Sequence, residues 1–124
     1  MLTERDIERI TSRIAREYAP LVVGLFGSYA VGTPTQDSDL DLYVIKESVD
    51  PPLARVRAVR RMLFGVLHPL DIHVFTPEEF EEEVYETLSF AWVIARQSRV
   101  YYAADRAERC VPSLFGGRSG PAPS

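Results

Sequence analysis

Three aspartates and a glycine–serine pair are the residues of this 124-residue chain whose types and spacing could support chemistry. Gly27 and Ser28 close an apolar run, and after ten further residues Asp39 and Asp41 open a second one. A glycine after a strand lets backbone N–H groups approach a bulky anion, and the start of a helix there would add a positive dipole end. Residues i and i+2 of a strand share a face and lie about 6.6–7 Å apart along it. We therefore expect a cation site that faces a phosphate site.

Asp71 is the third of these acids, and it lies in a later apolar run at residues 70–75. If this strand lies beside the strand that carries Asp39 and Asp41, all three acids share a face. Converging carboxylates repel one another unless a cation lies between them, and hard oxygen ligands favour Mg²⁺ or Mn²⁺ over zinc. The alternative is that the aspartates simply reach water, which the D-x-D pattern alone would favour. His73 is interpreted as a neighbouring or core histidine rather than a catalytic one.

The spacing of apolar residues predicts one small domain of the α/β (α+β) class, in which helices pack on a small mixed β-sheet. The domain is expected to span residues 1–112, because residues 113–124 have the composition of a flexible tail. Helices are expected at residues 3–18, 53–67, 77–88 and 89–97, and strands at residues 21–26, 39–45, 70–75 and 99–103.

Two of the expected helices carry strongly charged faces, and each face has two interpretations. Arginines cluster from Arg55 to Arg61, where a solvated face is favoured over contact with phosphate or with a partner. Six glutamates between residues 78 and 86 also favour a solvated face, and a docking surface for a basic partner is the alternative.

Composition narrows the classes of protein. The formal net charge is −4, so direct binding to nucleic acid is not expected. No apolar run has the length of a membrane span and the N-terminus is charged, so we expect neither a signal peptide nor a membrane anchor. Cys110 is the single cysteine, which excludes an internal disulfide and favours a cytoplasmic protein with Cys110 as a bystander thiol.

The segment GSYAVGTPTQDSDLDLYVI, together with Asp71, resembles the active-site signature of the DNA polymerase β-like nucleotidyltransferases. It looks most like the minimal nucleotidyltransferases (MNT), which include the antitoxin partners of HEPN toxins. The resemblance covers about residues 20–100. Its specificity comes from the whole combination: a Gly-Ser pair, ten residues, a D-x-D pair and a third acid in a later strand.

The resemblance implies a role for each residue of the signature. Gly27 and Ser28 would hold the triphosphate of ATP through backbone N–H groups and a hydroxyl. Asp39 and Asp41 would ligate two Mg²⁺ ions, and Asp71 would complete the metal site and help to activate the attacking hydroxyl. The implied chemistry is in-line displacement at the α-phosphorus with pyrophosphate as the leaving group, in which positioning and charge stabilisation carry most of the catalysis.

The short chain leaves no room for a separate acceptor-binding domain, so a partner protein or a homodimer is expected to supply the acceptor site. For an MNT antitoxin, the resemblance implies transfer of AMP to a hydroxyl, a tyrosine, of a cognate HEPN ribonuclease toxin. Two alternatives stay open. One is a non-catalytic antitoxin that neutralises its partner by binding alone, and the other is a small-molecule nucleotidyltransferase of the antibiotic-modifying kind.

Overall fold

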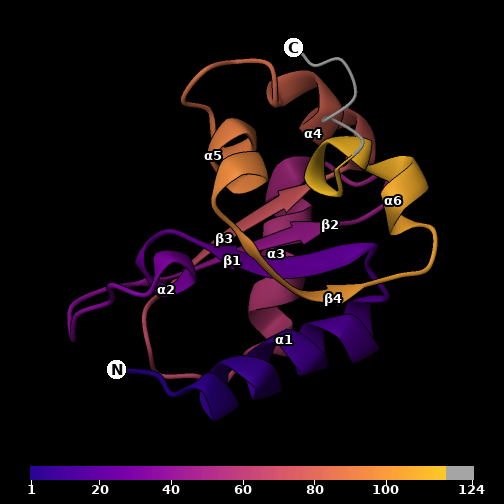
Figure 1. The fold of residues 1–124 in the computed structure, drawn as a ribbon. Coiled ribbons are helices and arrows are strands. Elements are labelled where there is room, and N and C mark those ends of the chain that lie inside the picture. Colours follow the sequence, from indigo (N-terminus) through magenta and orange to yellow (C-terminus); the bar gives the residue numbers. More distant parts are fainter. Residues whose placement is uncertain (117–124) are drawn as a thin grey trace.

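A four-stranded mixed sheet forms the centre of the protein, whose computed structural model describes residues 1–116 (Figure 1). Strand β1 is antiparallel to β2 and to β4, whereas β2 and β3 are parallel. The predicted α/β class with a small mixed sheet is confirmed, and every expected strand forms within one residue of its predicted bounds. In sheet order the strands are β3 (Leu70–Phe75), β2 (Leu40–Ile45), β1 (Val22–Phe26) and β4 (Arg99–Ala103).

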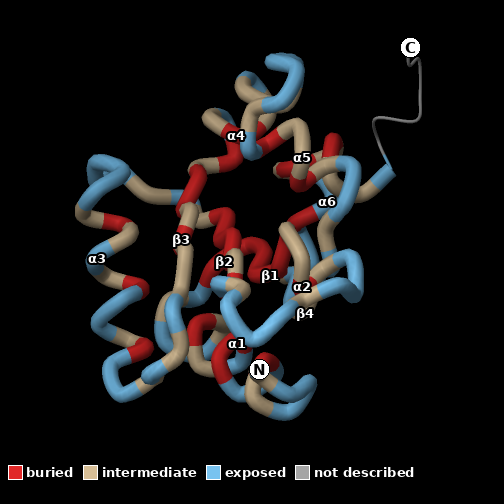
Figure 2. The backbone as a smooth tube through the Cα atoms, turned by 90° about the vertical axis from the view of Figure 1, so that its left-hand side faces the viewer, coloured by how far each residue is buried: buried red, intermediate tan, exposed pale blue. Residues whose placement is uncertain are grey.

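Helices cover both faces of the sheet. The first and third helices pack on one face, and the fourth to sixth pack on the other. In Figure 1 the first helix lies below the sheet, the third behind it and the fourth to sixth above it. Each face has its own cluster of buried apolar side chains, and the two central strands, β1 and β2, are almost entirely buried (Figure 2). The helices are α1 (Glu4–Tyr18), α2 (Ser28–Val31), α3 (Pro52–Met62), α4 (Pro77–Glu83), α5 (Phe90–Arg96) and α6 (Ala107–Cys110).

The side chains of β2 alternate between the two clusters, as the sequence pattern predicts. Leu40, Leu42 and Val44 are buried toward α1 and α3, whereas Tyr43 and Ile45 are buried beneath α4 to α6. A shift of one residue in strand pairing would turn each of these side chains to the wrong cluster. The apolar pattern therefore holds the register of the strand that carries the acids.

Gly24, in the middle of β1, has no room for a side chain. A Cβ atom there would lie 2.6 Å from the Tyr43 ring and 2.5 Å from the carbonyl oxygen of Arg99. Glycine normally weakens a strand, and it marks places where another group approaches the backbone closely. Here it lets the Tyr43 ring lie across β1, where the Tyr43 hydroxyl and Ser98 are 3.3 Å apart.

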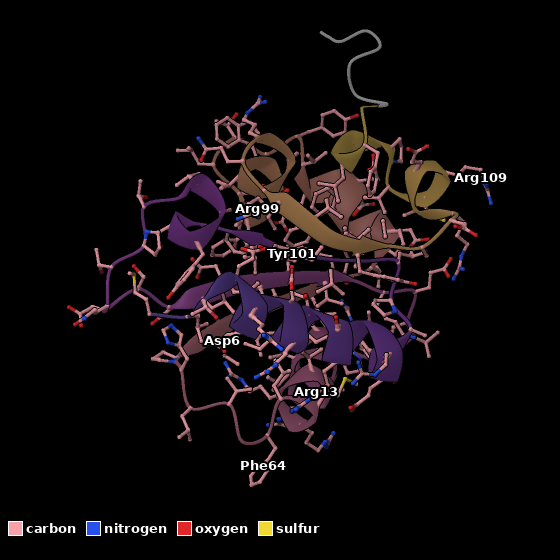
Figure 3. All side chains as sticks on the ribbon, turned by 60° about the horizontal axis from the view of Figure 1, so that its bottom comes forward. Asp6, Arg13, Phe64, Arg99, Tyr101 and Arg109 are labelled. Atoms are coloured by element: carbon pink, nitrogen blue, oxygen red, sulfur yellow. The ribbon has the colours of Figure 1, made fainter. Side chains whose placement is uncertain are left out.

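Helix α3 ends at Met62 rather than at the predicted residue 67. Arg13 of α1, which Figure 3 labels, donates a hydrogen bond of 3.2 Å to the carbonyl oxygen of Met62. Gly65 then has a φ of +97°, which directs the chain away from the helix. The early end depends on a contact between helices far apart in sequence, which apolar spacing does not reveal.

Helix α4 also ends early, at Glu83 rather than at residue 88. The hydroxyl of Ser89 donates to the carbonyl oxygen of Glu83 at 2.9 Å, and Leu88 has a φ of +71°. Leu88, the last residue of the expected helix, consequently lies outside it and is 76% exposed. Ser89 then caps α5, which forms within the predicted segment 89–97.

Helix α1 begins with the predicted capping box. Thr3 Oγ1 accepts from the backbone N–H of Asp6 at 3.1 Å, and Asp6 accepts from the N–H of Thr3 at 2.9 Å. Glu4 ties the same end of the helix to β4, because it accepts from the Tyr101 hydroxyl at 2.8 Å and lies 3.5 Å from the guanidinium of Arg99 (Figure 3).

The expectation of a solvated arginine face on α3 is wrong for Arg55. Its side chain is only 2% exposed and forms two hydrogen bonds with Glu79, at 2.8 and 2.7 Å. Further bonds run to the carbonyl oxygens of Val74 at 2.9 Å and Asp50 at 3.0 Å. An arginine is tolerated in the interior when its N–H groups are satisfied in this way. Arg55 therefore links α3, β3 and α4.

The solvated interpretation of the glutamate face also needs correction, because three of its members have partners. Glu79 binds Arg55, Glu83 lies 3.4 Å from the backbone nitrogen of Ala91, and Glu81 accepts from the Ser113 N–H at 3.0 Å and the Ser113 hydroxyl at 2.7 Å. Ser113 belongs to a short 3₁₀ helix, Pro112–Leu114, that follows α6.

Most of the predicted tail, residues 117–124, lies outside the described residues. Within residues 1–116, no helix combines the length and the apolar composition needed to cross a membrane.

Replacing Arg55 with methionine should lower the free energy of unfolding by about 2–4 kcal/mol, because Glu79 and the Val74 carbonyl would lose a buried partner. Urea denaturation followed by circular dichroism measures the change. Arg57→Met is the matched control: Arg57 is exposed on the same helix, so its loss should change stability by less than about 0.5 kcal/mol. Equal effects of the two substitutions would show that the Arg55 contacts do not stabilise the fold.

The stabilising effect of Glu79 should depend on pH. Hydrogen bonds from Arg55 hold the Glu79 pKa below its usual 4.5. A lowered folded pKa means that the stabilisation is complete above about pH 4.5 and disappears as the pH falls through the folded pKa. The stability difference between wild type and Glu79→Gln should therefore be largest near neutral pH and shrink in acid. A difference that stays constant down to about pH 3 would contradict the charge–charge contribution. Glutamine keeps the acceptor of the capping box with Thr76, so α4 should still be capped.

Candidate active site

Asp41 and Asp71 lie side by side because β2 and β3 are parallel and in register. Asp41 pairs with Asp71, just as Tyr43 pairs with His73 two residues further on. Paired residues of parallel strands project their side chains from the same face of a sheet. The charge of Asp71 contributes to raising the pKa of Asp41. The structure thus brings Asp71 to the face where the sequence expects it.

Asp39 immediately precedes Leu40, the first residue of β2, and is exposed to solvent. Its charge acts on Asp41 and raises the Asp41 pKa, so the three acids share one electrostatic environment. They come from two neighbouring strands and stand at the ends where these strands begin.

The Gly27 turn lies directly against this acidic group. Gly27 follows Phe26, which pairs with Asp41 across the sheet. Its φ is +74°, and a Cβ atom at this position would overlap the Oδ2 atom of Asp41. Only glycine fits both the backbone conformation and the space. Ser28 follows as the first residue of α2, which is one turn long, so the helix dipole expected there is small.

The acids carry more negative charge than their surroundings neutralise. Burial, followed by the charges of Asp71 and Asp39, raises the pKa of Asp41 from 3.8 to about 6, and His73 opposes this shift. A raised carboxyl pKa reports that the ionised form is unfavourable where it stands. A cation among the acids would remove that penalty.

A divalent cation fits the chemistry of these donors, because Mg²⁺ and Mn²⁺ prefer carboxylate oxygens. Among residues 1–116, no three acidic, histidine or cysteine side chains already converge on one point at ligand distance. Asp39 is exposed and the Asp71 side chain is 49% exposed, so both have room to turn toward Asp41. The residues that fit a metal are therefore Asp39, Asp41 and Asp71.

His73 contacts the acid group directly. Its Nε2 atom lies 3.0 Å from the Oδ2 atom of Asp71, and its ring packs against the rings of Phe26 and Phe90, which also contact each other. The sequence analysis does not assign Phe90 to the site. Its position as the first residue of α5, directly after the N-cap Ser89, is the one feature of the sequence that could have drawn attention to it. Its neighbours in space are about twenty residues or more away in the sequence, so spacing alone could not place it beside β3.

Three carboxylates from two parallel strands, facing a glycine turn, form a site suited to phosphoryl transfer assisted by a cation. The sequence match agrees with this class. The nucleotidyltransferase domain model matches residues 7–103, most of the chain. The chain therefore belongs to the nucleotidyltransferase domain family. No protein with a curated description of its function matches it.

Solved toxin–antitoxin complexes contain chains of similar fold. A chain from a toxin–antitoxin crystal structure with AMP-PNP is 18% identical at a TM-score of 0.57, covering 91% of this chain and 87% of that one. A chain from a mutant of such a complex, with two aspartates changed to glutamate, is 17% identical at a TM-score of 0.54, with coverages of 96% and 89%. A chain of the MntA–HepT complex is 14% identical at a TM-score of 0.50, with coverages of 94% and 88%. The sequence match thus confirms the expected nucleotidyltransferase family, and these structures confirm that the fold is similar to that of chains in toxin–antitoxin complexes.

Replacing Gly27 with alanine should damage the site more than the matched change at Gly32. Both glycines have positive φ, +74° and +84°, so each alanine should cost about 1–2 kcal/mol of strain. A Cβ atom at Gly27 would also displace the Asp41 carboxylate, whereas a Cβ at Gly32 meets no atom within 4 Å. Thermal melting with and without Mg²⁺ and ATP measures both effects. Gly27→Ala should lose the stabilisation by Mg²⁺ and ATP, and Gly32→Ala should keep it. Stabilisation of both variants by the ligands would contradict the close packing of the turn on Asp41.

Proposed function

We propose that this chain is a Mg²⁺-dependent nucleotidyltransferase that transfers AMP from ATP to a hydroxyl, a tyrosine, of a cognate HEPN ribonuclease toxin. It would act in this way as the antitoxin. The observation that supports the proposal best is the in-register pairing of Asp41 with Asp71, opposite the Gly27 turn. The family match supports the reaction class, and the fold shared with toxin–antitoxin complexes supports the kind of partner.

Asp39, Asp41 and Asp71 would hold two Mg²⁺ ions. When bound, the ions would supply positive charge beside the attacking and leaving oxygens of the reaction. The contribution of the chain is to keep three carboxylates on two strands whose spacing the sheet fixes. Burial of Asp41 strengthens its attraction for a cation, because less water competes for the charge.

Gly27 and Ser28 would bind the triphosphate of ATP. The positive φ of Gly27 turns the chain from β1 into α2, and the backbone N–H groups of this turn would be donors to the phosphates, with the Ser28 hydroxyl as a further donor. The AMP-PNP in the structure of one toxin–antitoxin complex is an analogue of ATP, which supports ATP as the donor here.

Asp71 would orient the acceptor hydroxyl and take its proton. As the acceptor oxygen bonds to the α-phosphorus, the bond from that phosphorus to the bridging oxygen breaks and pyrophosphate leaves. The AMP then remains on the acceptor as a phosphodiester. Most of the rate increase would come from alignment and charge stabilisation.

The reaction can be tested with ATP labelled at the α-phosphate, Mg²⁺ and the purified product of the adjacent gene. Wild-type protein should label the partner, and Asp41→Asn or Asp71→Asn should reduce the rate at least about 100-fold. Asp37→Asn is the matched control, because Asp37 is an exposed loop aspartate whose side chain has no role in the proposal. It should label as the wild type does. Absence of label with wild type, or equal label with all variants, would overturn the proposal.

The same variants separate transfer from simple binding when the partner is expressed in cells. If transfer neutralises the toxin, Asp41→Asn and Asp71→Asn should fail to protect although they still bind the partner. Full protection by both variants would instead support an antitoxin that acts by occlusion. Labelling of an aminoglycoside by wild type without any partner would support the small-molecule alternative.

A further inference from the structure

The ring of His73 packs against two phenylalanines beside the acids. Its centroid lies 5.3 Å from that of Phe26, at an interplanar angle of 68°, and 4.2 Å from that of Phe90, at 44°. Phe26 and Phe90 are also in edge contact, with their centroids 6.0 Å apart. The three rings come from β3, β1 and α5, so this aromatic cluster forms only in the tertiary fold.

The side chain of His73 makes one polar contact that the structure records within residues 1–116. Its Nε2 atom lies 3.0 Å from Asp71 Oδ2, and a proton on Nε2 makes the imidazole the donor. Asp71 is two residues away on the same strand and the same face. The hydrogen bond restrains a carboxylate that is otherwise half exposed at the edge of the sheet.

We propose that His73 is a positioning residue for Asp71, and this inference rests on the proposed function. By occupying Oδ2, the imidazole fixes the rotation of the Asp71 carboxylate. The Oδ1 atom is then left for the cation and for the acceptor hydroxyl. Partners that hydrogen-bond to metal-binding carboxylates typically change metal affinity or activity about 10–100-fold when removed.

The position of Phe90 argues for this role over simple core packing. A histidine that only filled space would be covered from all sides, yet the His73 side chain is 19% exposed and its covering residue Phe90 is 50% exposed. The Nε2 atom of the ring lies at hydrogen-bond distance from the acid, and the ring also contacts the two phenylalanines. Phe90 thus keeps a large aromatic side chain half exposed at the surface while it contacts the His73 imidazole.

Two substitutions at His73 separate the hydrogen bond from the packing. Phenylalanine keeps an aromatic ring against Phe26 and Phe90 but removes the donor. Glutamine loses the ring but keeps an N–H group that can reach Asp71. Tyr43→Phe is the control for stability alone, because Tyr43 pairs with His73 in the sheet and its hydroxyl bonds only to Ser98 among the described contacts.

The readout is the affinity for Mn²⁺ in the presence of AMP-PNP, measured on the full chain by electron paramagnetic resonance of free Mn²⁺. His73→Phe should bind Mn²⁺ about tenfold more weakly than wild type, and His73→Gln should recover most of that loss. Tyr43→Phe should melt at a lower temperature but bind Mn²⁺ as wild type does. In the transfer reaction, His73→Phe should lower kcat while leaving the KM for ATP nearly unchanged.

Unchanged Mn²⁺ affinity in His73→Phe, or equal losses in the phenylalanine and glutamine variants, would overturn the positioning role. If His73→Phe fails to fold, Phe90→Ala decides the question: freeing one side of the imidazole should weaken Mn²⁺ binding, and wild-type affinity would overturn the inference. Wild-type protein that binds Mn²⁺ and AMP-PNP but labels no partner would overturn the proposed function and leave the role of His73 in metal binding intact.

Discussion

The parallel, in-register pairing of β2 with β3 is the constraint on which the rest of the site depends. It sets Asp41 beside Asp71, although like charges at that distance repel. The apolar residues of the same strands maintain the pairing, because Leu42 and Ile72 pair with each other and are buried in the opposite cluster. Hydrophobic burial on one face of the sheet thus holds carboxylates together on the other, where electrostatics alone would separate them.

Arg55 and Asp41 are charged residues in opposite environments. Arg55 is buried, but Glu79 and two backbone carbonyl oxygens satisfy its N–H groups, so it serves the fold by joining α3, β3 and α4. Asp41 is partly buried beside further acids, and its raised pKa shows that the fold leaves its charge largely unneutralised. Charge left unneutralised in a folded protein is a mark of a functional site, because it costs stability that packing elsewhere must offset.

Local patterns in the sequence were sufficient for the elements and for the acids. Period-two alternation located β2 and β3, and the capping box located the start of α1. The early end of α4 depends on the nearby contact between Ser89 and Glu83, but the other errors involve contacts between distant segments. Arg55 looked solvated because Glu79 lies 24 residues away, and α3 looked longer because the carbonyl of Met62 meets Arg13 of another helix. The aromatic cluster of His73, Phe26 and Phe90 could not be predicted for the same reason, since its rings come from three elements.

The packing of Gly27 against Asp41 also bears on the order in which ligands bind. An anion held by the Gly27 backbone would lie next to the Asp41 carboxylate, and two negative groups in contact repel strongly in a partly buried site. Among the residues 1–116 that the structure describes, His73 is the one group whose charge lowers the Asp41 pKa. A single imidazole cannot balance three carboxylates and a triphosphate. If a nucleotide binds as proposed, a cation would have to enter with it or before it, because the turn and the acids can share an anion only when positive charge lies between them.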